Sequence, residues 1–512
     1  MAIRKRLSWG VAASALGQAV QAFYAVGLVP FFMRSWGAEG YGRWLTLTAL
    51  VSYLSFLELG GQNYIANLLA VHHVKGEVDS FRKRLSEGVS LFLFMGIAAY
   101  ALVIVVLFAF VLLPWPGAGY LLATSDAWVL AILSAFTLLL AIPAGVYASA
   151  YRSAGLFVRG SLVANGTRIV GMGVSIALLY FRVSPVVYAA GFFGIGFVLT
   201  MIIVWDASRF IPGCRGLRVS LRAALDGWRH LEGSLHFWLI GIAQGVIQQG
   251  VVIVLSLFGS ATLVAVYATH RSLASFSGYI GVLLQAPILP ELSFLWAQGR
   301  LADLRRTTAL AIRAVTFLTG AGAIFLWIFV PLIFSWWTRS QLDLQPALLA
   351  VLLIQGVLAA GWSTSTWSLL AVNRHRPVAL WSLVNAVLTV TLASCLAPAY
   401  GPLGVAAACL VGDCACGLRV YPALAASFLE VPARTLYAQL AFAMLALVPI
   451  ATCVYLASLA LQGWWLLAAY CLIGVAAAYP AIVFVGWGFL DKDAHDNCVP
   501  SPVPGNVQEA PV

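Results

Sequence analysis

Long runs of apolar residues follow one another along almost the whole chain, and each is interrupted by a short polar stretch. An α-helix needs about 20 mostly apolar residues to cross a bilayer. Runs of this length predict fourteen membrane-spanning helices, with the least marked breaks near residues 183 and 260. They cover residues 7–33, 41–71, 89–113, 128–151, 156–181, 184–205, 235–258, 262–296, 308–337, 346–372, 378–396, 403–425, 436–459 and 464–485. The second and eighth runs are longer than a perpendicular span, so we expect them to tilt or to extend beyond the membrane.

Composition agrees with this pattern. Of the 512 residues, 62% are hydrophobic and only 9% are charged, whereas soluble domains carry about 25% charged residues. The chain is therefore expected to be an all-α integral membrane protein. Its eight cysteines show no metal-ligand spacing, and Cys414 and Cys416 are interpreted as packing residues.

The basic residues indicate how the helices are oriented. If the N-terminus is cytoplasmic, the inside segments hold 22 Lys and Arg, and the outside segments hold only Arg34, Arg43, Arg182 and Arg339. This asymmetry follows the positive-inside rule, and one missed or invented span would destroy it. We therefore expect both termini to be cytoplasmic. The net charge of +11 is explained by this topology, so no nucleic-acid partner is expected.

An internal repeat divides the chain. At an offset of about 222 residues, "VKGEVDSFRKRLSEG" matches "AQGRLADLRRTTALA", with Gly76 over Gly299. "SAYRSAGLFVRGSLVANG" matches "LAVNRHRPVALWSLVNAV", with Arg152 over Arg374. These matches predict two parallel six-helix halves related by a pseudo-two-fold axis along the membrane normal, an arrangement that supports alternating access in transporters.

The predicted organisation has five parts. A first six-helix half is followed by a basic cytoplasmic linker, a second six-helix half, two further helices (13 and 14) and a Pro-rich polar tail that we expect to be disordered. The boundaries are 1–208, 209–234, 235–430, 431–488 and 489–512. The opening "MAIRKR" precedes an apolar run that continues to Met33, so we expect an uncleaved first helix rather than a signal peptide.

Several stretches resemble a known family. They are "LVPFFMRSWGAEGYGRWLTLTALVSYLSFLELGG", "LPELSFLWAQGRLADLRR", and "LLAVNRHRPVALWSLVNAVL" followed by "APAYGPLGVAAACLVGD". In order and spacing the chain resembles the polysaccharide (O-antigen) flippases of the multidrug/oligosaccharidyl-lipid/polysaccharide exporter superfamily. The resemblance implies that the chain moves an undecaprenyl-pyrophosphate-linked oligosaccharide across the bacterial cytoplasmic membrane. It also implies membrane lipids as partners, with a polysaccharide polymerase and chain-length machinery as further candidates.

Ionisable residues inside spans are costly, so they are candidates for a cavity. Arg271 lies about 13 Å from the outer end of its span at 1.5 Å per residue, and its guanidinium suits a pyrophosphate or an acidic sugar. His270 points about 100° away and is favoured as a hydrogen-bonded packing residue over a proton carrier. Glu58, in "FLELGGQNY", is as compatible with an ion site as with a buried salt bridge.

Further candidates are less marked. Asp413 lies mid-span in the twelfth helix. The arginines at the outer mouth and at the inner loops would draw an anionic headgroup along the cavity, and glutamines in helices 1 and 7 would hydrogen-bond sugar hydroxyls. Interhelical hydrogen bonding explains these glutamines equally well. These candidates are Arg34, Arg43, Arg152, Arg374, Gln21 and Gln248.

Three alternative functions stay open. A cation-coupled multidrug exporter would need an acidic residue in the outer cavity, and helices 1 and 7 carry none. A lipid II flippase resembles the chain in its helix-8 arginine, but the basic–acidic pair of that branch is absent from helix 1. A membrane-embedded glycosyltransferase or polymerase is the least favoured, because the outer loops are short and no nucleotide motif occurs. No enzyme activity and no cofactor are expected, and coupling to a proton or sodium gradient is left open.

Overall fold

The computed structural model describes residues 16–21, 23–52, 65–66, 68–69, 72–73, 75–112, 125–230, 235–372 and 374–460. All regular secondary structure in these ranges is helical, which confirms the predicted all-α class. In chain order the elements are α2 (Val29–Ser52), α4 (Val78–Leu112), α6 (Ser125–Ser153), α7 (Phe157–Tyr180), α8 (Pro185–Phe210), the 3-10 turn η2 (Pro212–Cys214), α9 (Leu221–His230), α10 (Leu235–Phe258), α11 (Ala261–Ala297), α12 (Leu301–Trp337), α13 (Pro346–Ala371), α14 (His375–Gly412), the π-helical turn η4 (Asp413–Leu418), α15 (Arg419–Phe428) and α16 (Ala433–Ala460).

Within the described ranges, nine helical stretches are long and apolar enough to cross a membrane. His375–Phe428 contains two predicted spans, and Leu16–Leu50 overlaps the end of the first predicted span and the beginning of the second. α6 and α11 coincide with two further predicted spans. The described helices thus match parts of the first two predicted spans and then the third to the thirteenth in order. Residues 7–15, most of 53–71 and all of 464–485 lie outside the described residues, so the number fourteen stays a prediction.

Glycines in conformations that other residues rarely adopt mark where helices bend. Gly37 (φ 71°) lies inside α2, and Gly401 (φ 54°) lies inside α14 between two prolines. In both places the sequence predicts a gap between two spans, and in the structure a non-helical residue separates two helical stretches there, so both predicted gaps are present. The breaks near residues 183 and 260, which the hydropathy pattern marks least clearly, are both present in the structure. Ser184 caps α8, and Ser260 accepts a hydrogen bond from the backbone N–H of Leu263 at the start of α11.

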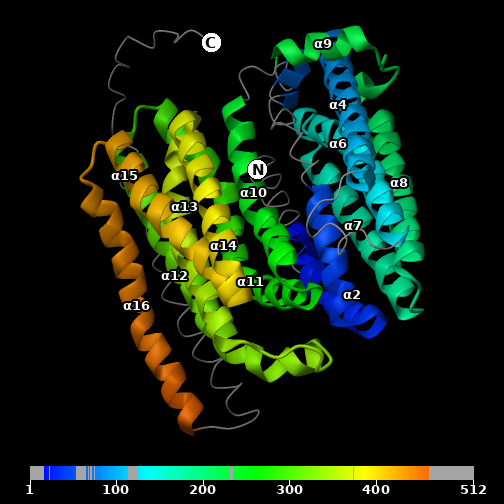
Figure 1. Ribbon diagram of the computed structural model, residues 1–512. Helices are drawn as coiled ribbons and strands as arrows, with labels where there is room; N and C mark the ends of the chain where they lie inside the picture. Colours follow the sequence, from blue (N-terminus) through cyan, green and yellow to red (C-terminus); the bar gives the residue numbers. More distant parts are fainter. Residues whose placement is uncertain are drawn as a thin grey trace. The chain divides into compact units, whose positions relative to one another are not determined.

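The described residues form two compact units (Figure 1). Unit 1 comprises Met1–Thr269, Ser335–Asp343 and Ala386–Ala408. In it α6 packs between α4 and α8, α7 packs on α8, and α9 lies across α4. Its core is an apolar cluster that α4, α6 and the end of α8 share, and the largest side chains buried there include Phe92 and Tyr151.

Unit 2 comprises His270–Phe334, Leu344–Asn385 and Cys409–Val512. In it α13 packs against α15 and the π-helical turn, and α15 packs against α16. Small residues allow close helix approach: a Cβ built on Gly361 of α13 would lie 2.1 Å from Leu440 of α16. Such small-residue contacts are typical of helix packing in membranes.

The predicted repeat is visible in local backbone structure. At the start of α4, Gly76 has φ 72° and Glu77 N–H donates to the His72 carbonyl over 3.0 Å. At the start of α12, Gly299 has φ 69° and Arg300 N–H donates to the Leu295 carbonyl over 3.0 Å. These turns are the same motif, 223 residues apart.

The second predicted match, which pairs Arg152 with Arg374, has similar turns in the structure, but their offset along the chain differs from the predicted one. The corresponding bonds run from Leu156 N–H to the Tyr151 carbonyl and from Arg374 N–H to the Leu369 carbonyl. The turn geometry places Arg374 opposite Leu156 at the two helix ends, four residues from the expected match. The equivalence of Arg152 and Arg374 stays a prediction.

Candidate functional site

A buried carboxylate lies at the irregular turn of unit 2. Asp413 is 7% exposed and opens the π-helical turn that joins α14 to α15. Its Oδ2 accepts a hydrogen bond from Gln355 Nε2 at 2.9 Å, and its Oδ1 accepts one from Asn385 Nδ2 at 3.1 Å. Among the described residues, the carboxylate has these two amides as partners and no cation. Three helical segments thus converge on one acidic group.

Residues of α13, α14 and α15 pack closely around this turn. Gly417 lies against Trp362 of α13, and a Cβ at this position would come within 2.7 Å of the indole ring. The indole packs on Tyr421, with ring centroids 5.1 Å apart. The Tyr421 hydroxyl lies 2.8 Å from the Ser382 hydroxyl. The indole Nε1 is buried without a hydrogen-bond partner among the described residues.

The chemistry that this arrangement permits follows from its charge. A buried carboxylate is costly unless it is paired, hydrogen-bonded or protonated. Neutral amides satisfy its oxygens but leave its negative charge uncompensated. π-Helical turns are frequent at functional sites. The Asp413 site, made of Asp413, Gln355 and Asn385, can therefore hold a proton or a monovalent cation. Sequence reasoning identified Asp413 alone, because the two amides lie far away in the chain.

His270 is a packed residue of unit 2. Its side chain is fully buried, and its Nε2 accepts the backbone N–H of Gln345 at 2.9 Å. Its ring lies 4.9 Å from that of Phe334. A ring nitrogen that accepts a hydrogen bond carries no proton, so this geometry requires the neutral imidazole with its proton on Nδ1. Gln345 is the N-cap of α13 and Gln355 lies ten residues further along, so His270 and the Asp413 site are about 15 Å apart along that helix.

The predicted arginines lie in three settings. Arg271 is half-buried on α11 in unit 2. Arg34 of unit 1 is exposed and its guanidinium lies 5.0 Å from the centre of the Tyr180 ring. Arg43 of unit 1 pairs with Glu39 at 2.6 Å, and both side chains are more than half exposed. Such an exposed ion pair contributes at most about 1 kcal/mol to stability.

The remaining predicted residues lie at helix ends or on exposed faces. Arg152 is exposed in the last turn of α6, and Arg374 is the exposed N-cap of α14, 5.1 Å from the Phe428 ring. Gln21 and Gln248 are both exposed in unit 1. Glu58 lies outside the described residues.

A charged cluster that the sequence reasoning missed ties α7 to the end of α8. Arg159 donates through Nη2 to Asp206 Oδ1 at 2.6 Å and through Nε to Oδ2 at 3.0 Å. The Tyr151 hydroxyl donates to the same Oδ2 at 2.6 Å. An aspartate in the last turns of an apolar helix was the available signal, since such a group needs a partner. The bidentate geometry and the low exposure of Asp206 indicate a structural role.

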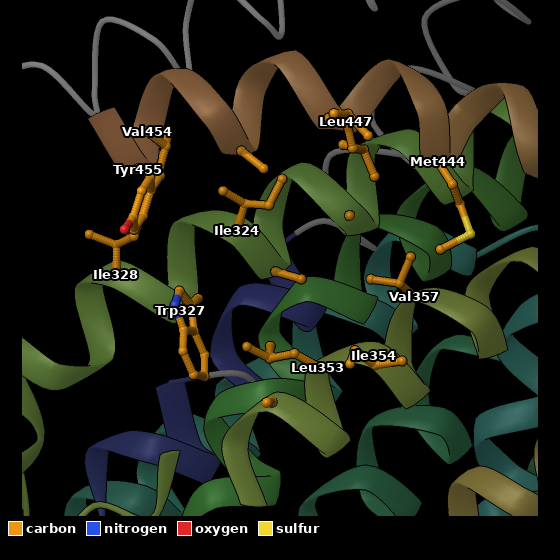
Figure 2. Close-up of a pocket in the computed structure, with 15 residues that line it drawn as sticks. Ile324, Trp327, Ile328, Leu353, Ile354, Val357, Met444, Leu447, Val454 and Tyr455 are labelled. Atoms are coloured by element: carbon orange, nitrogen blue, oxygen red, sulfur yellow. The ribbon is translucent and has the colours of Figure 1, made fainter. Parts of the chain in front are cut away.

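An apolar cavity of about 520 Å³ lies between α12, α13 and α16 of unit 2. Figure 2 shows Ile324, Trp327 and Leu353 on one side and Met444, Leu447 and Val454 of α16 on the other. Its lining carries no charged side chain. Trp327 and Tyr455 are 44% and 63% exposed, so the cavity is open at the surface. It can receive a hydrocarbon chain but not an ion.

Comparison with known proteins gives structural likenesses alone. No family model matches the chain, and no curated protein matches it in sequence. A structure of the lipid II flippase MurJ in an inward closed conformation matches with a TM-score of 0.67 at 14% identity, over 94% of this chain and 99% of that one.

Multidrug transporters of the MATE family match as well. An inward-facing MATE transporter of the MOP superfamily matches with a TM-score of 0.58 at 14% identity, over 83% of this chain and 98% of that one. The MATE transporter ClbM in complex with Rb⁺ matches with a TM-score of 0.54 at 17% identity, over 85% and 96%. The chain is thus an all-helical membrane protein with the fold of the MOP-superfamily transporters.

Proposed function

We propose that the chain is a flippase of the bacterial cytoplasmic membrane that translocates a polyprenyl-pyrophosphate-linked oligosaccharide by alternating access. The observation that carries the proposal is the likeness to a lipid II flippase over nearly the whole length of both chains. The name of that protein states a lipid-linked substrate. A polysaccharide polymerase and chain-length machinery are the proposed downstream partners.

Two features of unit 2 support a lipid-linked substrate. The wholly apolar cavity between α12, α13 and α16 suits a hydrocarbon chain. The permanently charged guanidinium of Arg271 suits an anion such as a pyrophosphate, because it can donate two parallel hydrogen bonds. Neither the apolar cavity nor the arginine would be expected in a binding site for a soluble cationic drug.

The choice between lipid-linked substrates rests on charge. Residues 7–33 contain no Asp, Glu, Lys or Arg, so the basic–acidic pair that the lipid II branch carries there is absent. This absence favours a polysaccharide repeat unit over lipid II, which is the second candidate because of the MurJ likeness.

Deletion of the gene in its native host tests the proposal. We expect the surface glycan to disappear and the lipid-linked repeat unit to accumulate on the inner leaflet, as measured by extraction and mass spectrometry of the lipid-linked pool. Accumulation of lipid II together with cell lysis would favour the second candidate. A normal surface glycan with altered drug resistance would refute a lipid-linked substrate.

Arg271 provides a sharper test. If bidentate anion recognition matters, Arg271→Ala and Arg271→Lys should both reduce glycan export, since lysine keeps the charge but lacks the planar pair of donors. Arg168→Lys, on another predicted span, is the matched control and should export normally. Protein abundance in the membrane is measured in parallel. Full export by Arg271→Ala would remove this residue from the mechanism.

We further propose that transport is coupled to a proton or sodium gradient at the Asp413 site. A buried carboxylate with amide partners is suited to bind either cation, and the ClbM structure shows that one transporter of this fold binds the monovalent Rb⁺. Asp413→Asn should remove the dependence of transport on the gradient in vesicles, whereas Asp343→Asn, at an exposed loop carboxylate, should retain it. Unchanged gradient dependence in Asp413→Asn would refute coupling at this site.

A further inference from the structure

The short helix α9 is anchored to the first turns of α4 in unit 1. Gly227 packs so closely on α4 that a Cβ there would lie 2.9 Å from the Glu87 carbonyl oxygen. Ala224 is buried on the same side. The Ser86 hydroxyl donates to the Arg218 carbonyl, just before α9 begins. Figure 1 shows the outcome: α9 lies across α4 near the N-terminal end of that helix.

A second face of α9 is apolar and exposed. Leu221, Leu225 and Trp228 are 60%, 59% and 54% exposed. Their spacing of four and three residues places them in one stripe along the helix. The stripe is separate from the face formed by Ala224 and Gly227, which α4 covers. Three large apolar side chains on one ten-residue helix therefore have no protein cover in the described part of the chain.

Basic side chains flank this stripe. Arg218, Arg222 and Arg229 are exposed. Arg229 is 3.4 Å from Asp226, while Arg218 and Arg222 pair with no acidic side chain among the described residues. Both also line a groove of about 470 Å³ with Arg82 and Lys83 of α4. The groove includes three acidic residues, of which Glu87 is 5% exposed and pairs with Arg84.

The level of α9 along α4 is that of the membrane boundary. α9 packs against Glu87 and Leu91, and the apolar run predicted to cross the membrane in this helix begins at residue 89 and ends at residue 113. A helix at this level with one apolar stripe and a basic border has the pattern of helices that lie in the plane of a membrane interface. There tryptophan is favoured, and arginine side chains reach the headgroups.

We propose that α9 and Arg218 form an in-plane binding surface for the anionic headgroups of phospholipids in the leaflet that faces the basic loops. Leu221, Leu225 and Trp228 enter the acyl boundary, while Arg218, Arg222 and Arg229 bind the phosphates. The surface fixes the depth of the first half of the protein in that leaflet. It is independent of the transported substrate, so it stands or falls separately from the proposed flippase activity.

The role of the three arginines in this surface is tested on the purified full-length protein. Binding of phosphatidylglycerol and phosphatidylcholine is compared by native mass spectrometry. Each interfacial arginine is expected to contribute about fivefold to binding of an anionic lipid. The triple variant Arg218→Gln/Arg222→Gln/Arg229→Gln should therefore lose the preference for phosphatidylglycerol. The triple variant Lys75→Gln/Arg376→Gln/Arg434→Gln removes the same net charge from exposed positions elsewhere and should keep it.

The apolar half is tested by thiol labelling in phosphatidylglycerol-containing vesicles. Leu225→Cys should resist a membrane-impermeant maleimide, and Arg222→Cys on the same helix should react, with peptide mass spectrometry separating these sites from the native cysteines. Three outcomes would overturn the proposal: equal loss of lipid preference in both triple variants, equal labelling of both cysteines, or displacement of phosphatidylglycerol by inorganic pyrophosphate. Equal labelling would leave the stripe facing water, as a soluble protein partner would require.

Discussion

Gly42 determines how closely α2 approaches the first residue of α11 in unit 1. A Cβ at position 42 would lie 1.7 Å from the carbonyl oxygen of Ala261, far inside van der Waals contact. The neighbouring atom belongs to the backbone, so a side-chain rotation cannot relieve the clash. In the sequence, Gly42 is one of 46 glycines. The residues next to it give no sign of its contact with Ala261.

Gly42→Ala should lower the stability of the folded protein by about 1–3 kcal/mol, because the two backbones must move apart. Gly166→Ala is the control, since a Cβ there meets no atom within 4 Å, and alanine should raise helix stability by about 0.5–1 kcal/mol. Thermal unfolding of both variants in the same detergent gives the comparison. Equal midpoints would contradict the close approach.

Glu77 gives a pH-dependent prediction outside the membrane spans. A hydrogen bond with His72, whose Nδ1 lies 2.7 Å from the carboxylate, holds the pKa of Glu77 below its ordinary value of 4.5. A lowered pKa in the folded state means that the carboxylate stabilises the protein above pH 4.5 and that this contribution is lost as the pH falls through the lowered pKa.

The thermal midpoint of Glu77→Gln should therefore lie below that of the wild type at pH 6. The difference should shrink below pH 4.5 and disappear as the pH falls through the lowered pKa of Glu77, where the wild-type carboxyl also becomes neutral. A difference that grows on acidification would contradict the assigned direction of the shift.

The sequence predicts residue roles unevenly. Asp413 could be singled out because a carboxylate in an apolar run is costly at any position. Gln355 and Asn385 could not, because amides in membrane helices commonly join helices and their partner is 58 and 28 residues away. Asp206 and Arg159 were missed because each lies near a predicted span end, where a charge needs no special explanation.

At the scale of elements, hydropathy locates the breaks between spans but not their geometry. The predicted gap between residues 396 and 403 contains Pro398, Gly401 and Pro402. These residue types favour a turn when the local sequence is considered alone. In the structure Gly401 has non-helical backbone angles and separates two helical stretches within α14, as the local pattern predicts. The corresponding place in the first half, around Arg182, is also a break, between α7 and α8. The local pattern locates both breaks, but it does not indicate that one is made by a single glycine and the other by a longer connection.

Gly401→Ala should destabilise the protein by about 1–3 kcal/mol, because φ 54° and ψ −133° are disfavoured for any residue with a Cβ. No atom lies within 4 Å of the added methyl group, so a loss of stability would report the backbone conformation alone. The matched control is again Gly166→Ala, and the measurement is thermal unfolding in detergent. An unchanged midpoint would show that the kink is not held at this residue.

At the scale of the whole molecule, span order and the repeat were predictable because both depend on patterns that persist over twenty or more residues. The shared turn at Gly76 and Gly299 supports the repeat independently of hydropathy. The apolar cavity was not predictable, since its lining comes from three helices whose contact depends on packing.

The predicted orientation can be checked by reporter fusions. Alkaline phosphatase, which is active only outside the cytoplasm, should be active when fused after Arg182 or Arg339 and inactive when fused after Gly299. A fluorescent reporter that folds only in the cytoplasm should give the reverse pattern. Each of these fusion sites is separated from the next, on the opposite side of the membrane, by an odd number of predicted spans. A single extra or missing span between two sites would therefore invert the result at the later site and refute the count.

The π-helical turn at Asp413 has a consequence for how this chain should be compared with others. A π-helical turn holds one more residue than an α-helical turn, so it shifts every later side chain by one position around the axis, about 100°. In an alignment with a protein whose helix is unbroken here, residues 419–428 therefore match the correct positions only if that protein's sequence receives a one-residue gap opposite residues 413–418. Without that gap, Tyr421 and the residues after it are aligned to positions on the wrong helix face. The turn thus has the form of a single-residue insertion, and deleting one residue within it should restore a regular helix.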